Sequence, residues 1–119
     1  MAKIGKPIKN VIRGDTRTVN LTFLDTDGST PINLAGGTVY FTVQTDSDPD
    51  NDSAAVIQKT ENSSFTDAAN GQHTFTLSHA DTNIDPDEYW YDAQFVDVAG
   101  NYLSAYRGKF IVQSDTTRT

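Results

Sequence analysis

The chain has 119 residues and no cysteine, which suits one domain that buries its core without disulfide bonds and excludes cysteine nucleophiles and cysteine metal sites. Sixteen acidic and nine basic residues give a net charge of −7, so nucleic acid is disfavoured as a partner because phosphate contacts dominate that affinity. No apolar stretch approaches the length needed to cross a bilayer, so no membrane contact is expected.

The basic residues are concentrated at the N-terminus. The first 17 residues hold five of the nine basic residues and a single acidic one, Asp15, so they carry a net charge of +4 and the remainder carries −11. This asymmetry predicts that residues 1–13 form a basic arm that docks on acidic protein surface, either of its own body or of a neighbouring copy. A frayed, solvated terminus is the alternative. The candidate interface residues of the arm are Lys3, Lys6, Lys9 and Arg13.

Alternation of apolar and polar residues predicts β-strands along most of the chain. In "TVNLTFLD", for example, Val19, Leu21 and Phe23 share one face. Such a pattern is typical of half-buried strands of antiparallel sheets. Strands are predicted at 17–24, 38–44, 54–60, 72–78, 88–97 and 102–112, with shorter pairings at 10–13 and 31–34.

Turn residues separate these strands. In "FLDTDG" and "FVDVAG" an aspartate can accept a hydrogen bond from the backbone two residues on, and a glycine free to adopt positive φ follows three residues after it. Both motifs predict hairpin ends. One helical turn, capped by Ser78, is expected in "LSHADTNIDPDE". Short strands at this spacing indicate a sandwich of two antiparallel sheets over residues 14–113, followed by a tail at 114–119.

The segment "EYWYDAQFVD" contains Trp90, the only tryptophan of the chain. A period of two places Trp90 on the outer face beside Asp92 and Gln94. Three interpretations of Trp90 follow: cover by a loop of the same domain, contact with another protein, or a platform for a sugar ring. The residues predicted to face the core are Tyr89, Tyr91, Ala93 and Phe95.

Residues suited to metal binding or catalysis are few. The acidic segment "DSDPDNDS" places aspartates at alternate positions from Asp46, but as a calcium loop it has Asn51 where glycine is required and Ile57 where glutamate is required. An acidic, solvated loop without a metal is therefore predicted. The only histidines are His73 and His79, and no nucleophile or phosphate-binding motif is found. We expect neither enzymatic activity nor a cofactor.

Six segments follow one another over nearly the whole chain: "RGDTRTVNLTF", "INLAGGTVYFTV", "AAVIQKT", "DAANGQHTFTLSHADT", "EYWYDAQFVD" and "RGKFIV". In this order they resemble the small immunoglobulin-like domains of tailed bacteriophages, in particular the N-terminal domain of phage baseplate upper proteins. The resemblance implies an all-β fold, an immunoglobulin-like antiparallel β-sandwich of about seven to eight strands. Its motifs are structural rather than catalytic.

The same resemblance implies a non-enzymatic structural protein of the virion, an Ig-like subunit or adaptor of the tail, baseplate or neck, assembled in the host cytoplasm. Its expected partners are other virion proteins and further copies of itself. One alternative is a capsid decoration protein. The other is a carbohydrate-binding module that contacts host glycans through Trp90, Tyr40 and Tyr102; such a module exposes two or three rings on one face, whereas an assembly subunit buries them against protein.

Overall fold

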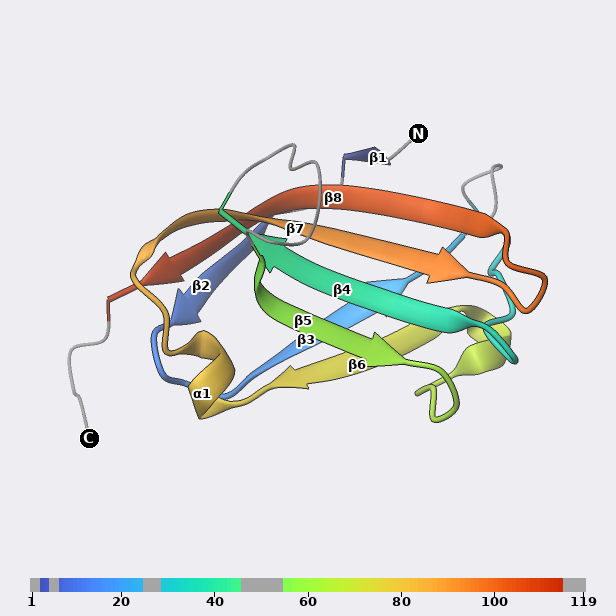
Figure 1. Ribbon diagram of the computed structural model, residues 1–119, viewed down its shortest axis with the longest axis horizontal. Coiled ribbons are helices and arrows are strands. Elements are labelled where there is room, and N and C mark those ends of the chain that lie inside the picture. The colour runs from blue at the N-terminus through green and yellow to red at the C-terminus, as the bar shows by residue number, and fades with distance from the viewer. Residues whose placement is uncertain (1–2, 5–6, 25–28, 46–54, 115–119) are drawn as a thin grey trace.

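The computed structural model describes residues 3–4, 7–24, 29–45 and 55–114; for Lys3, Ile4, Asn10 and residues 103–106 it describes the backbone alone. Two β-sheets face each other across a hydrophobic core, with the larger sheet above the smaller one in the view of Figure 1. The predicted all-β sandwich is confirmed at this level. Eight strands lie within the described residues.

The larger sheet has six strands. Its central strands, β7 (Asp87–Val96) and β4 (Thr38–Gln44), pair antiparallel, with Tyr91 opposite Val43 and Phe95 opposite Val39. Strand β8 (Tyr102–Gln113) flanks β7, and β5 (Ala55–Glu61) flanks β4, again antiparallel. These four strands were predicted from alternation, and alternation also fixes which side chains face inward.

The edge of this sheet beyond β8 is formed by the N-terminal segment, which confirms a short strand pairing near the predicted positions 10–13. Strands β1 (Lys3–Ile4) and β2 (Ile8–Ile12) both pair with β8, and they run parallel to it. Val11 is fully buried in the core, and Ile8 packs against the core. Residues 8–12 are therefore part of the larger sheet, although they lie within the segment predicted as a basic arm.

The smaller sheet contains β3 (Arg17–Thr22) and β6 (Gln72–Leu77), which pair antiparallel along their whole length. Both alternate as predicted: Val19 and Leu21 face the core, as do Phe75 and Leu77. The predicted pairing at 31–34 is reduced to an isolated bridge between Pro31 and Leu24.

Aromatic rings fill the space between the sheets. The Phe41 ring centroid lies 5.8 Å from that of Tyr91, 6.3 Å from that of Phe75 and 6.4 Å from that of Phe110, so this ring on β4 contacts rings on three other strands, from both sheets. The inward residues predicted for β7, Tyr89, Tyr91, Ala93 and Phe95, are all buried.

The connections are built by side chains that satisfy nearby backbone groups. At the β7–β8 hairpin, Asp97 Oδ1 accepts hydrogen bonds from the N–H groups of Ala99 (3.0 Å) and Asn101 (2.8 Å), and Gly100 has φ of 87°, as "FVDVAG" predicts. The motif "FLDTDG" runs into 25–28, which lie outside the described residues. The helical turn α1 (His79–Thr82) is capped by Ser78, as predicted, and Asp81 completes a capping box.

Candidate functional site

The strongest candidate site is the outer face of the six-stranded sheet along β7. The odd-numbered residues of β7 point into the core, so the even-numbered ones lie on the outer face. These are Glu88, Trp90, Asp92, Gln94 and Val96. The predicted register of this strand is thus confirmed. Across the sheet, Trp90 lies between Gln44 of β4 and Lys109 of β8, and Asp92 lies between Thr42 and Arg107. We call this surface the Trp90 face.

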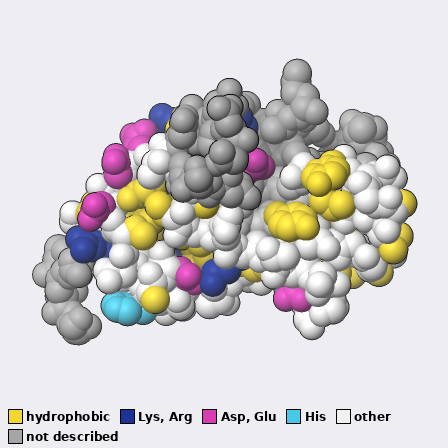
Figure 2. Space-filling view, viewed as in Figure 1, with side chains coloured by type: hydrophobic (Ala, Val, Ile, Leu, Met, Phe, Trp, Pro, Cys, Tyr) yellow, Lys and Arg dark blue, Asp and Glu magenta, His cyan; other side chains and the backbone are white. Residues whose placement is uncertain are grey.

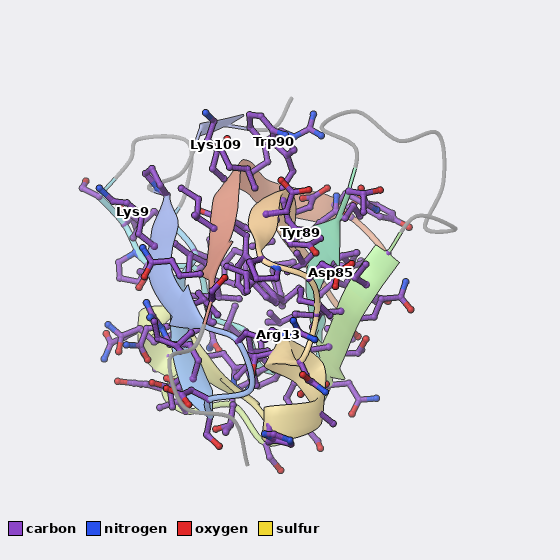
Figure 3. The ribbon with its side chains drawn as sticks, turned by 90° about the vertical axis from the view of Figure 1, so that its left-hand side faces the viewer. Lys9, Arg13, Asp85, Tyr89, Trp90 and Lys109 are labelled. Carbon is purple, nitrogen blue, oxygen red and sulfur yellow. The ribbon has the colours of Figure 1, made fainter. Side chains whose placement is uncertain are left out.

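Trp90 is half-buried and is partly covered by its own domain. The Lys109 ammonium lies 6.0 Å from the centroid of the Trp90 ring, a distance compatible with a cation–π contact. The same Lys109 Nζ is 3.4 Å from Glu88 Oε1, so the ammonium lies near both the Trp90 ring and the Glu88 carboxylate, which are two residues apart on β7. Figure 3 shows Lys109 and Trp90 side by side at one edge of the molecule. The remaining exposed part of the ring is available for a ligand or partner.

Two further rings share this outer face. Tyr40 is 40 % exposed and lies opposite Gln94, whereas Tyr102 is 72 % exposed and lies opposite Val96. Val96 lies directly opposite Thr38, two residues before Tyr40, so Val96 is a diagonal neighbour of Tyr40. Figure 2 shows hydrophobic side chains gathered over the adjoining ends of β4 and β7. The Trp90 face therefore combines three aromatic residues with amide and carboxylate groups, a combination that suits a protein or glycan contact.

Of the basic interface residues predicted at the N-terminus, the two whose side chains are described, Lys9 and Arg13, lie away from Trp90. Lys9 is exposed on β2, and Arg13 lies at the end of the sandwich near Asp85, both separate from Trp90 in Figure 3. Arg13 is anchored rather than free, because its backbone N–H donates to Gln113 O (3.0 Å) and its Nε donates to Asn83 Oδ1 (3.4 Å). For Lys3 the backbone alone is described, and Lys6 lies outside the described residues.

A cluster of hydrogen bonds that sequence reasoning missed joins the β2–β3 turn to α1. Thr82 is fully buried, and its Oγ1 donates to Asp15 O at 2.7 Å. The Gly14 N–H donates to Thr82 O at 3.2 Å, and His79 Nδ1 lies 2.6 Å from Gly14 O, which requires a proton on Nδ1 because the carbonyl can only accept. These contacts join residues about 65 positions apart, and no local motif predicts them. They fix the turn in which Arg13 is held.

Tyr89 is anchored at the same end of the molecule. Its hydroxyl donates to Asp85 O at 2.6 Å, and Figure 3 shows Tyr89 and Asp85 close together. Burial raises the pKa of Tyr89, and the negative charges of Asp85 and Asp87 raise it further, while Arg13 acts in the opposite sense. Tyr89 is thus a neutral hydrogen-bond donor near neutral pH and serves to position the 83–88 connection.

His73 is placed in the core rather than at a reactive surface. Its ring is buried on β6 and meets Phe75 edge to face, with centroids 4.5 Å apart, and Phe65 likewise at 5.8 Å. The Thr66 N–H donates to His73 Nδ1 at 3.4 Å, which uses the lone pair of the neutral ring. Burial lowers the pKa of His73, although the Glu61 carboxylate partly opposes this. The arrangement is that of a structural histidine.

The lowered pKa of His73 predicts loss of stability on mild acidification. The unfolded histidine has a pKa of about 6.5, and the folded value is lower, so between these two values unfolding takes up a proton. The free energy of unfolding therefore decreases as the pH is lowered through this range, by at most about 1.4 kcal/mol per pH unit. Urea denaturation at pH 7.5, 6.5 and 5.5 should show this fall, and His73→Gln should reduce it. His79 is retained in both proteins, so their difference isolates His73. An equal dependence of the free energy of unfolding on pH in the parent chain and in His73→Gln would contradict the prediction.

Within the described part of the chain, no group of three or more His, Cys, Asp or Glu side chains could hold a metal ion. The acidic segment from Asp46 to Asp52 lies outside the described residues, so its predicted character as a metal-free loop stays a prediction. Among the same described residues, no helix is both long enough and apolar enough to span a membrane.

No protein-family model matches the chain, and no curated protein sequence matches it. A function is therefore proposed from the Trp90 face, the fold and the motifs of the sequence.

Proposed function

We propose that this protein is a non-enzymatic structural protein of a tailed-bacteriophage virion, an Ig-like subunit or adaptor that acts through protein–protein contacts in the tail, baseplate or neck. The observation that carries the proposal is the Trp90 face, a broad sheet surface with exposed rings. Tyr40 and Tyr102 expose 40 % and 72 % of their surface on it, and Val98 in the adjoining hairpin exposes 80 %. Grouped apolar side chains on a small domain favour a contact surface.

The strand order supports the immunoglobulin-like part of this proposal. The larger sheet runs β1-β8-β7-β4-β5, with β2 also paired to β8, and it packs against the pair β3-β6. In an immunoglobulin variable-type sandwich strand C and the last two strands, F and G, likewise lie together in one sheet, and strands B and E are neighbours in the other. The first strand lying beside the last one agrees with the same topology. The sequence segments that resemble phage Ig-like domains include the central strands of both sheets.

Particle association tests this proposal directly. Virions produced from the genome that encodes the chain should be purified on a density gradient, washed at high salt and probed by mass spectrometry and immunogold electron microscopy. We expect the chain in the particles, with gold at the tail, baseplate or neck. Gold over the head would favour the capsid decoration alternative. Absence from washed particles, with the chain present in the lysate, would refute a virion role.

A carbohydrate-binding module is the second candidate, and the shared outer face of Trp90, Tyr40 and Tyr102 favours it. Stacking on sugars requires the rings to remain exposed, so Tyr102→Ala should abolish retention on a glycan array if this candidate is correct. If the face contacts protein instead, the parent chain should not be retained on the glycan array. Tyr102→Ala should then reduce incorporation into particles. The proposed contacts of Lys3, Lys6 and Lys9 with acidic protein surface belong to the virion candidate alone.

A further inference from the structure

The smaller sheet has an open strand edge along β3. Its only described strand partner is β6, on one side. The N–H of Phe23 donates to Gly71 O at 2.8 Å, so odd-numbered residues of β3 direct their backbone groups toward β6. The backbone N–H and C=O groups of Thr18, Asn20 and Thr22 therefore point the other way, toward the outer edge.

The corresponding edge of β6 is occupied by the chain itself. The Gln72 N–H donates to Asp67 O, and the Asp67 N–H donates to Gln72 O, both at 2.9 Å. The Thr74 N–H donates to Thr66 Oγ1 at 3.0 Å. These bonds also show that the backbone N–H and C=O groups of even-numbered residues of β6 point away from β3. Residues 66–67 thus block a second strand from pairing with much of β6.

The two edges of the larger sheet carry features that oppose strand pairing. On β5 the register shifts near Ala55, and Lys59 projects toward the interior, where its Nζ lies 2.7 Å from Asp81 Oδ2. On the opposite edge, β2 follows Pro7, has a register shift between Ile8 and Val11, and exposes Lys9. Bulges, proline, lysine and inward charges are the features by which edge strands avoid association. Strand β3 has none of them between Thr18 and Thr22.

The outer edge of β3 is also complementary to itself. Antiparallel pairing of two copies about Asn20 places Thr18 opposite Thr22 of the second copy and Asn20 opposite its counterpart. Every residue from Thr18 to Thr22 is uncharged, so this approach brings no like charges together although each chain has a net charge of −7. Threonine pairs across antiparallel strands are favourable, and the three facing pairs can exchange six backbone hydrogen bonds.

We propose that β3 is a self-association edge: two copies of this chain pair through β3 in antiparallel fashion and join their smaller sheets into one four-stranded sheet, β6-β3-β3-β6, with twofold symmetry. The occupant of the edge is a second copy of the chain, and its recognition is backbone pairing between uncharged strands. This inference goes beyond the proposed virion role and does not depend on it.

A charge-swap experiment tests the edge and its register. Thr18→Lys with Thr22→Lys places like charges opposite each other across the twofold axis. Thr18→Lys with Thr22→Glu places opposite charges there, with substitutions at the same two exposed positions. Sedimentation equilibrium of the full chain, from micromolar to millimolar, should show a dimer whose dissociation constant rises about tenfold or more in the first variant and returns toward the parent value in the second.

Net charge cannot produce this result, since the first variant is less negative than the second. A matched control, Gln72→Lys with Thr76→Lys, adds the same charges to the outer face of β6, one strand further from the axis, and should weaken the dimer little. Circular dichroism confirms the fold of each variant. A parent chain that is monomeric throughout, a second variant as weak as the first, or a β6 control as damaging as the β3 variant would each overturn the proposal.

Discussion

Deletion of residues 1–13 should abolish cooperative folding rather than release an intact sandwich. It removes β2, the hydrogen bonds of β2 to β8, the fully buried Val11 and the partly buried Ile8. Burial of one such side chain contributes up to about 1.5–3 kcal/mol, and the deletion also exposes core residues of β8 such as Phe110. The combined loss is comparable to the whole stability of a small domain, about 5–15 kcal/mol. Thermal unfolding followed by circular dichroism measures the outcome.

The control deletes residues 1–6 and keeps β2. This shorter deletion removes β1, which pairs with β8 at Lys3 and Ile4 only, so a cooperative transition should persist. Val11→Ala in the full chain should lower the unfolding midpoint without removing the transition. A deletion of residues 1–13 that melts as cooperatively as the shorter one, at the same temperature, would show that β2 is dispensable and would restore the interpretation of these residues as an arm.

Phe95→Ala should destabilise the fold by about 3–5 kcal/mol, the range for truncating a buried phenylalanine. Phe95 is 1 % exposed, and its ring centroid lies 6.1 Å from that of Phe23 in the region next to β3. Its ring also covers Gly37, where an added Cβ would lie 2.5 Å from ring atoms of Phe95. Because the surroundings are this close-packed, the cavity left by truncation is costly. Denaturant unfolding gives the change in free energy.

The neighbouring residue on β7 provides the matched control. Gln94 points to the outer face opposite Tyr40, so Gln94→Ala should change stability by no more than about 0.5 kcal/mol. The contrast between adjacent positions tests the register of the central strand, because a slip of one residue would exchange the two faces. Equal unfolding midpoints for the two variants would contradict the assigned register.

The strands themselves were predictable because a two-residue period is a local property of the sequence. Val19 and Leu21 in β3, and Tyr91 and Phe95 in β7, face inward as alternation requires, since successive side chains of any strand point to opposite faces. The Asp97 turn and the Ser78 cap were equally predictable, because each consists of a side chain bonding to backbone a few residues away. The outer position of Trp90 followed from the same alternation.

The partners of those strands were decided by the tertiary structure. Charge counting assigned residues 8–12 to an arm, yet their apolar side chains complete the core beside β8, and hydrophobic burial outweighs the effect of net charge on where the segment lies. The cover of Trp90 by Lys109 and the Thr82–Asp15 bond join positions distant in sequence, so no local pattern contains them. Alternation determines the face of the sheet to which each side chain points. Long-range packing determines the order of the strands and which strand edge stays open. The sequence alone therefore determined most of the strands and their inward faces, and the packing of distant segments determined the Trp90 face and the open edge of β3.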